Sequence, residues 1–140
     1  MAVRYIIGIV GSRDYPDEVK VRNYVRSLPT NTIVVSGGRT SIYWPRFRGR
    51  GVDVWAANEA EQCKLTLIEH PPNPNNGIPA CFHIRNGLIV DEVKKHINKG
   101  LRGYIVAFSK QPITPGTQST INQANNKGVQ VIIEPISWIE

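Results

Sequence analysis

Cysteines and long apolar runs are scarce in this chain, and each scarcity excludes a class of protein. The only cysteines, Cys63 and Cys81, form no close-spaced pair, so neither a disulfide framework nor a two-cysteine metal motif is indicated. His70, His83 and His96 do not have zinc-finger spacing, and we expect no metal site and no required cofactor. No apolar run approaches the length that crosses a bilayer.

Signal-peptide features are also lacking. The first residues form a short strand-like apolar run, not a charged region followed by a helical apolar core. We therefore expect a cytoplasmic protein that does not associate with membranes. With 140 residues, a single domain over 1–140 is expected, and it is long enough to bury most of its apolar surface without cross-links.

Acidic residues are missing from one long stretch. Between Val19 and Val52 there are seven lysines and arginines and no aspartate or glutamate, in a chain whose formal net charge is +6. Such a block attracts phosphate groups, either on nucleic acid or on a small nucleotide. A solvated basic face that keeps the protein soluble explains the charge equally well.

Apolar runs and helical patterns alternate along the whole chain, with turn residues between them. The third helical pattern is the clearest, and its apolar stripe consists of Ile84, Leu88, Ile89, Val93 and Ile97. We predict strands at 3–10, 32–35, 65–68, 103–108 and 129–133, and helices at about 17–28, 54–62, 84–97 and 117–127.

This alternation predicts an α/β, Rossmann-like, doubly wound fold: a mainly parallel five-stranded sheet with helices on both faces. Ligands of such sheets bind beyond the carboxyl ends of the strands, near the point where the strand order reverses. The segments that follow the first, second and fourth strands should therefore meet at one edge, together with the start of the third helix.

The loops expected at this edge contain the components of a phosphate site. Glycines let backbone N–H groups approach an anion, helix N-termini add a favourable dipole, and arginines pair with phosphate oxygens. The candidates after the first two strands are Gly11, Ser12, Arg13, Ser36, Gly37, Gly38, Arg50, Gly51 and Asp53, and those near the later helices are Arg85, Asn86, Gly116, Thr117 and Thr120.

Each candidate also has an ordinary structural explanation. Gly11 and the pair Gly37-Gly38 can be plain turn residues, and Asp53 and Thr117 can simply cap the helices that follow them. The functional interpretation is favoured because every candidate falls on the same side of the predicted sheet.

The ordered set of motifs resembles the SLOG superfamily, which includes the DNA-processing protein DprA (Smf) and the LOG phosphoribohydrolases. It is most similar to the small single-domain branch related to YspA and YpsA. The resemblance implies a Rossmann-like domain whose strand-end loops bind a nucleotide or a nucleotide-derived ligand. The matching motifs are Gly11-Ser12-Arg13, Ser36-Gly37-Gly38, Arg50-Gly51-Val52-Asp53, Arg85-Asn86, and Gly116-Thr117 with Thr120-Ile121.

Two departures from the family pattern bear on activity. The small branch usually runs from Ser-Gly-Gly almost directly into Arg-Gly-Val-Asp, whereas here the ten residues 39–48 intervene. LOG hydrolases use a glutamate three positions after the threonine of their Gly-Thr pair, where this chain has Thr120. A hydroxyl does not replace a carboxylate in acid–base work. Asp53 is then the best acidic candidate for catalysis, and the sequence leaves open whether the chain is an enzyme.

The inserted segment 39–48 combines three arginines with three aromatic residues. This composition suits single-stranded nucleic acid, a lid that stacks on one nucleobase, or a contact between copies of the chain in a dimer or larger homo-oligomer. Aromatic residues that pack back onto the domain are the fourth alternative. Because the platform is small, we favour the lid and the subunit contact over nucleic acid.

Two functions from different classes follow. The leading prediction is a protein that binds a nucleotide or phosphorylated nucleotide derivative, either as a nucleotide-processing hydrolase or as a sensor. Arg13, Arg50 and Arg85 would neutralise phosphate in this protein, Thr117 would bond a phosphate oxygen, and Asp53 would contact a ribose hydroxyl or act in catalysis. The alternative is a DprA-like, non-catalytic protein that binds single-stranded nucleic acid with strong salt dependence.

Overall fold

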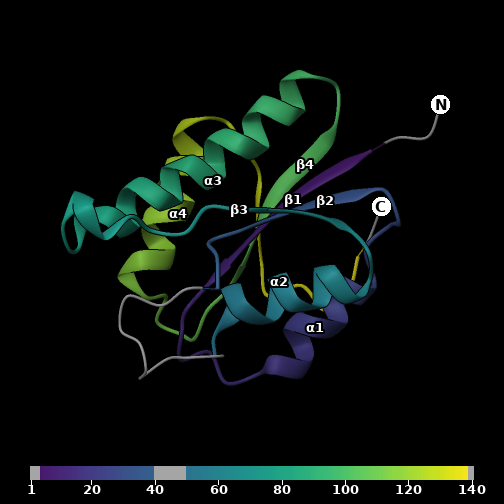
Figure 1. Ribbon diagram of the computed structural model, residues 1–140, viewed down its shortest axis with the longest axis horizontal. Coiled ribbons are helices and arrows are strands. Elements are labelled where there is room, and N and C mark those ends of the chain that lie inside the picture. Colours follow the sequence, from purple (N-terminus) through teal and green to yellow (C-terminus); the bar gives the residue numbers. More distant parts are fainter. Residues whose placement is uncertain (1–3, 40–49, 139–140) are drawn as a thin grey trace.

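The computed structural model describes residues 4–39 and 50–138, which form a five-stranded sheet and four α-helices (Figure 1). The strands are β1 (Tyr5–Gly11), β2 (Thr32–Ser36), β3 (Thr66–Glu69), β4 (Arg102–Phe108) and β5 (Val131–Ile133). The helices are α1 (Glu18–Arg26), α2 (Val52–Gln62), α3 (Ala80–Asn98) and α4 (Pro115–Asn126), with a 3-10 turn, η1 (Pro74–Asn76), before α3.

The sheet has the strand order β3-β2-β1-β4-β5, and every neighbouring pair is parallel. The central strand β1 pairs Ile7 with Val34 of β2 on one side and with Tyr104 of β4 on the other. The chain moves from β1 toward β3 in its first half and from β4 to β5 in its second half, so the strand order reverses between β1 and β4. The predicted α/β Rossmann-like fold is confirmed.

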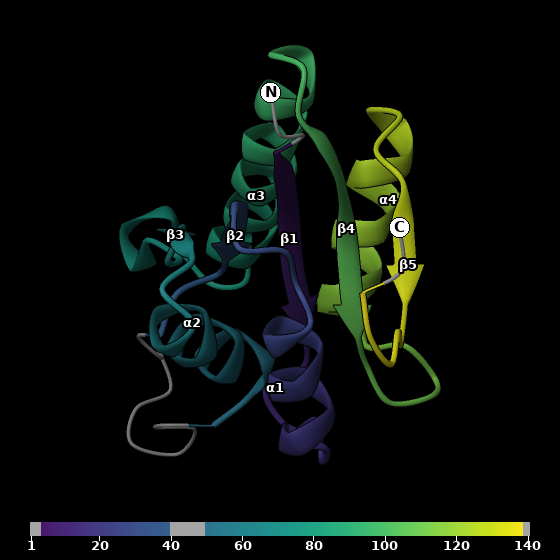
Figure 2. The ribbon, with the colours of Figure 1, turned by 90° about the vertical axis from the view of Figure 1, so that its right-hand side faces the viewer.

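Helices α1 and α2 cover one face of the sheet and α3 and α4 cover the other (Figure 2), and an apolar layer lies between each pair of helices and the sheet. Successive residues of a strand point to opposite faces, so Ile7 and Ile9 of β1 pack under α1 and α2, while Ile6 and Val10 pack under α3 and α4. All four side chains are at most 4% exposed. The near-continuous apolar run of the first predicted strand therefore reflects burial on both faces.

Helix α3 differs from its predicted stripe. Ile89 and Val93 are buried, and Ile97 packs partly buried against the same layer, but Ile84 and Leu88 are each 44% exposed. The helix also begins four residues earlier than predicted. The prediction for Ile84 and Leu88 was wrong because the buried face of α3 consists of Cys81, Asn86, Ile89, Val90 and Val93, and these two residues lie off that face. The other boundaries lie within two residues of the predicted ones.

Asp53 and Thr117 do not cap their helices. Gly51 and Thr114 take the capping positions, which places both predicted caps within the first helical turn. Neither Gly51 nor Thr114 caps its helix with a side-chain hydrogen bond. The predicted start of α1 is correct, since Asp17 accepts a hydrogen bond at 3.0 Å from the backbone N–H three residues later.

Most of the inserted segment 39–48 lies outside the described residues. Its first residue, Arg39, forms ion pairs of 2.7 Å with Glu61 of α2 and with Glu69 of β3. The lid and the subunit contact stay predictions. Across 4–39 and 50–138, no helix has the length and apolar character needed to cross a membrane.

Glu59 of α2 joins α1 and α2 through a buried ion-pair junction. Its carboxylate accepts hydrogen bonds from Arg22 at 3.1 Å and from Arg26 at 3.0 and 3.2 Å, although Glu59 is only 2% exposed. Burial opposes ionisation, but the two guanidinium groups outweigh it and hold the pKa of Glu59 below its usual value. Such a carboxylate adds stability above its unfolded-state pKa, and this stability is lost as the pH falls through the folded-state pKa.

We expect Glu59→Gln to lower the free energy of unfolding at pH 7 by about 1–3 kcal/mol, because charge-assisted hydrogen bonds are lost. The difference from wild type should shrink below about pH 4, where the wild-type carboxylate also takes up a proton. Urea unfolding at several pH values measures both effects. Glu18→Gln is the control, since Glu18 pairs with Arg22 at 2.8 Å in an exposed position and should contribute less than about 0.5 kcal/mol. Equal losses in the two variants would contradict the role given to Glu59.

Candidate functional site

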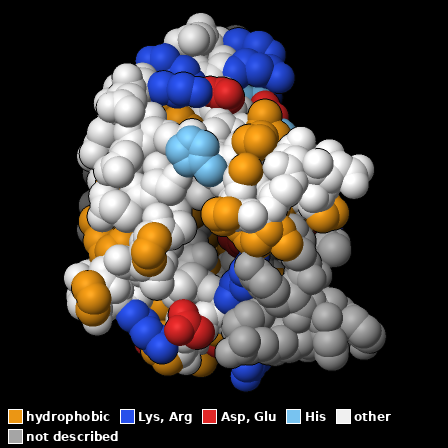
Figure 3. Space-filling model, turned by 90° about the vertical axis from the view of Figure 1, so that its left-hand side faces the viewer, with side chains coloured by type: hydrophobic (Ala, Val, Ile, Leu, Met, Phe, Trp, Pro, Cys, Tyr) orange, Lys and Arg blue, Asp and Glu red, His pale blue; other side chains and the backbone are white. Residues whose placement is uncertain are grey.

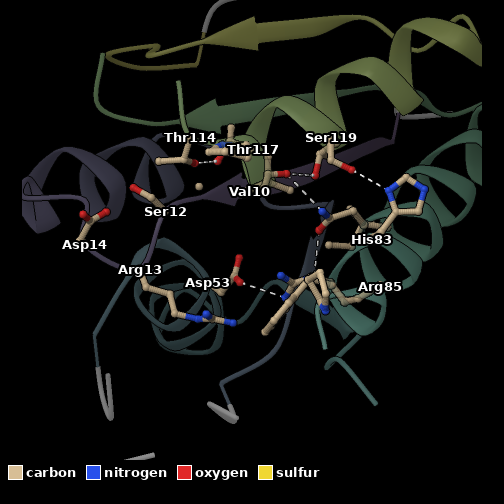
Figure 4. Close-up of a pocket in the computed structure, with 18 of the residues that line it drawn as sticks. Val10, Ser12, Arg13, Asp14, Asp53, His83, Arg85, Thr114, Thr117 and Ser119 are labelled. Atoms are coloured by element: carbon tan, nitrogen blue, oxygen red, sulfur yellow. Dashed lines mark hydrogen bonds and ion pairs between the residues drawn. The ribbon is translucent and has the colours of Figure 1, made fainter. Parts of the chain in front are cut away.

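A cavity of about 650 Å³ opens at the carboxyl edge of the sheet, beside the end of β1 and the first turns of α4. Figure 3 shows the face of the molecule on which it opens, and Figure 4 shows the residues that line it. Its wall comes from the loop after β1 and from the first turns of α2, α3 and α4. This is the position where the strand order reverses, which is where ligands of doubly wound sheets bind. The volume is in the range of small-molecule and cofactor sites.

The structure brings most of the predicted site residues to this cavity. Two others, Ser36 and Gly37, are buried and do not line the cavity. A small hollow next to the cavity is lined by Gly38, Arg50 and Gly51. Some residues of the first and second predicted loops line both the hollow and the cavity. The predicted residues that line the cavity are Gly11, Ser12, Arg13, Asp53, Arg85, Asn86, Gly116, Thr117 and Thr120.

Arg85 and Asn86 form the central hydrogen-bond network of the site. The Nη1 atom of Arg85 donates to the carbonyl oxygen of Gly37 at 3.0 Å and to the carboxylate of Asp53 at 3.3 Å. Its Nε donates to Asn86 Oδ1 at 3.0 Å, and Asn86 Nδ2 donates to the carbonyl oxygen of Gly116 at 3.2 Å. Two adjacent residues of α3 thus tie together the loop after β2, the start of α2 and the start of α4.

Close packing explains two of the predicted glycines. A Cβ on Gly37 would collide with the Arg85 guanidinium, and a Cβ on Gly11 would collide with the carbonyl oxygen of Phe108. Close packing is therefore sufficient to explain a glycine at both positions. Gly116 differs from them, because a Cβ there would enter open space at the wall of the cavity.

The first turn of α4 supplies backbone donors to the cavity. The first N–H groups of a helix have no intrahelical acceptor, and Thr114 does not cap them with its side chain. Its hydroxyl instead bonds to the hydroxyl of Thr117 at 3.1 Å. The N–H groups of Gly116 and Thr117 are consequently placed to bind an anion at the positive end of the helix dipole.

The Ser12 hydroxyl lies beside the first turn of α4 (Figure 4). Ser12 is 9% exposed, and its Oγ forms no hydrogen bond of normal geometry within the described ranges, although it lies near enough to the Asp14 carboxylate to help lower the pKa of Asp14. A buried polar atom without a partner is costly and uncommon in folded proteins. Ser12 lines the cavity, but its hydroxyl has almost no accessible surface, so a polar ligand group reaches it only after the Ser12 side chain turns toward the cavity.

Two acids border the cavity and differ in their environment. The Asp53 side chain is 21% exposed; burial raises the pKa of Asp53 above its usual value, while Arg85 and Arg13 act in the opposite direction. Asp14 is exposed, and its hydrogen bond with Lys110, at 3.3 Å, lowers the pKa of Asp14. Of the two, Asp53 is the less exposed, and it pairs with Arg85 at 3.3 Å.

Phe82 adds an aromatic wall that the sequence analysis missed. The Arg13 guanidinium carbon lies 4.6 Å from its ring centroid, and that of Arg85 lies 6.0 Å away, within cation–π range. Phe82 was missed because the proline-rich loop before it suggested a later start of α3. Its position three residues before Arg85, on the same face of a helix, was the available signal. Further cavity residues that were missed are Asp14, Pro79, Ala80, His83, Thr114 and Ser119.

Glu134, which follows β5, holds the two loops that flank the cavity and was also missed. Its carboxylate accepts hydrogen bonds from the Tyr15 hydroxyl at 2.6 Å, from Lys20 Nζ at 3.1 Å and from the backbone N–H of Ser109 at 3.0 Å. Burial raises the pKa of Tyr15, and the bond to Glu134 raises it further. The loop after β1 and the loop after β4 are thereby fixed to each other through a residue far from both in sequence.

Comparisons of the chain with protein-family models, with curated proteins and with solved structures found no match. The described residues contain no group of three histidine, cysteine, aspartate or glutamate side chains arranged to hold a metal ion. The geometry of the cavity is therefore the basis on which its function is inferred.

We expect Glu134→Gln to lower the free energy of unfolding by about 1–3 kcal/mol, because an amide keeps the shape of the side chain but loses its charge-assisted bonds. Hydrogen exchange at the Ser109 amide should become faster. Asp14→Asn is the matched control, since the exposed pair of Asp14 and Lys110 joins the same two loops and should contribute less than about 1 kcal/mol. Unchanged exchange at Ser109 in Glu134→Gln would show that Glu134 does not hold this loop.

Proposed function

We propose that this chain is a cytoplasmic protein that binds a small phosphate-bearing ligand, of the nucleotide or nucleotide-derivative class, in the cavity beside β1 and α4. The observation that carries the proposal is the uncapped first turn of α4 in the wall of this cavity, with the buried Ser12 hydroxyl beside it. A hydroxyl donor and two backbone N–H donors in one cavity satisfy the oxygens of a phosphate group.

The rest of the cavity suits the nucleoside part of such a ligand. Phe82 offers an aromatic ring, and Ile89 and Pro79 add apolar surface, as expected for a pocket that receives a base. The Asp53 carboxylate can accept a hydrogen bond from a ribose hydroxyl. The resemblance to the SLOG superfamily rests on the same loops and implies the same class of ligand.

Asp53 is the proposed acid–base residue for any cleavage at the ribose of this ligand. It lines the cavity, and burial raises its pKa while the ion pair with Arg85 at 3.3 Å opposes that rise. Thr120, at the position of the LOG glutamate, is 1% exposed and bonds weakly to the carbonyl oxygen of Gly116 at 3.5 Å. Thr120 therefore has a structural role, and LOG-type cleavage is not proposed.

Binding of single-stranded nucleic acid has less support. Arginines in the hollow beside the cavity are already engaged by acids: Arg39 pairs with Glu61 and Glu69, Arg85 pairs with Asp53, and Arg13 also lowers the pKa of Asp53. A backbone-binding groove needs charges that phosphates can reach. We therefore favour a small ligand over a polymer.

We expect Ser12→Ala to leave the free energy of unfolding nearly unchanged, because its hydroxyl is unpaired, and to weaken binding of a phosphate-bearing ligand by about 10–100-fold. Isothermal titration with AMP, GMP, CMP, UMP and inorganic phosphate measures the affinities. Thr32→Val is the matched control, since Thr32 Oγ1 is also buried and unpaired but belongs to β2, outside the cavity.

Two results of this titration would contradict the proposal. One is the absence of binding by every member of the panel, and the other is equal affinity in wild type and Ser12→Ala. Tight binding of single-stranded oligonucleotides that falls steeply with salt, without binding of mononucleotides, would favour the polymer instead.

Gly116→Ala should weaken ligand binding without lowering the stability of the fold. A methyl group there meets no atom within 4 Å, so the free energy of unfolding should stay the same or rise by up to about 1 kcal/mol. The same methyl group would stand between the ligand and the donors of α4, and affinity for the ligand should fall. Gly11→Ala should do the reverse and destabilise the fold by collision with the backbone. Wild-type affinity in Gly116→Ala would show that the anion does not approach this turn.

A further inference from the structure

His83 of α3 and Ser119 of α4 face each other at the cavity wall, where α3 and α4 come together (Figure 4). The His83 Nδ1 atom lies 2.9 Å from Ser119 Oγ. His83 is exposed and Ser119 is half-buried, so a ligand in the cavity can reach the pair. A serine hydroxyl within hydrogen-bond reach of an imidazole is the arrangement that activates serine as a nucleophile.

Gln123 holds this pair in place. Its Nε2 donates to Ser119 Oγ at 3.2 Å and to the backbone carbonyl oxygen of His83 at 3.3 Å. A hydroxyl has one proton and two acceptor positions, and the Gln123 amide occupies one of the latter. In the imidazole tautomer that carries its proton on Nε2, His83 Nδ1 accepts the proton of Ser119.

We propose that Ser119 and His83 form a nucleophile and general-base pair that removes an acyl group from a carboxylic ester of the phosphate-bearing ligand. This inference rests on the proposed function, because the phosphate bound at the first turn of α4 would position the ester. A carboxylic ester is favoured over a phosphoryl group because the arginines of the cavity are next to Phe82 and Asp53, whereas phosphoryl transfer needs cations at the reacting group.

The helix geometry sets the shape of the substrate. Ser119 follows Gly116 by three residues, and a helix rises by about 1.5 Å per residue. The ester carbonyl must therefore lie about 5 Å from the bound phosphate, measured along the helix. The substrate class is a small phosphorylated compound, such as a nucleotide or sugar phosphate, with an O-acyl group close to its phosphate.

The reaction has two steps and balances without a further reactant besides water. Ser119 Oγ bonds to the ester carbonyl carbon while its proton passes to His83 Nδ1, and the carbon–oxygen bond to the alcohol breaks as the leaving oxygen takes that proton. Water then attacks the acyl carbon while His83 Nδ1 takes a proton from the water, and the bond between the acyl carbon and Ser119 Oγ breaks as His83 gives that proton to Oγ. The products are the free alcohol and a carboxylic acid.

Acetylation by p-nitrophenyl acetate tests the pair without knowledge of the natural ester. We expect an initial burst of nitrophenolate and an acetyl group mapped by mass spectrometry to Ser119. Ser119→Ala should abolish this acetylation, and His83→Gln should slow it by about 10²–10⁴-fold. Gln123→Met, which keeps both reacting residues but removes the amide that holds them, should slow it less. Ser137→Ala, an exposed serine outside the cavity, should react as wild type does.

Thermal unfolding of each variant checks that it is folded. A folded wild-type protein that binds AMP but carries no acetyl group on Ser119 would overturn this inference alone, as would an undiminished rate in His83→Gln. Acetylation of Ser119 in a protein that binds no member of the nucleotide panel would support the pair and contradict the proposed ligand. The two failures are therefore distinguishable.

Discussion

The hydrogen bonds of Arg85 and Asn86 join parts of the chain that the sheet alone would leave independent. Arg85 binds the Asp53 carboxylate and the Gly37 carbonyl oxygen, and Asn86 binds the Gly116 carbonyl oxygen. Because the two residues are adjacent on α3, a shift of that helix would move the start of α2 and the start of α4 together. The cavity keeps its shape through this network, and the burial of Asp53 that raises its pKa follows from the same packing.

Basic residues that form an acid-free block in the sequence pair with acidic residues in the folded chain. The basic block from Val19 to Val52 contains no acid, yet each of its first four members has an acidic partner from elsewhere in the chain. Lys20 pairs with Glu134, Arg22 and Arg26 pair with Glu59, and Arg39 pairs with acids of α2 and β3. A linear run of like charge is therefore neutralised in part by folding, and it is the local donors of the cavity that define an anion site.

The fold and the location of the site follow from the sequence because parallel strands carry their loops to a common edge. The start of α3 cannot be predicted from the sequence, because it depends on tertiary packing. Ile84 and Leu88 look like core residues in a helical pattern but lie exposed, while Phe82 faces the cavity. Glu134 could not be predicted either, because nothing in its local sequence links it to Tyr15 or Ser109. Contacts between distant segments determine these details, and local patterns do not encode them.

The central claim is that an anionic ligand binds at the first turn of α4, next to Ser12. Amide chemical shifts recorded during a titration with AMP test it most directly, because they report on each backbone N–H separately. The account predicts large, saturable shifts at Gly116 and Thr117 and a smaller shift at Ser12, with α1 unaffected. Unchanged amides in the first turn of α4, together with shifts elsewhere in the protein, would contradict it.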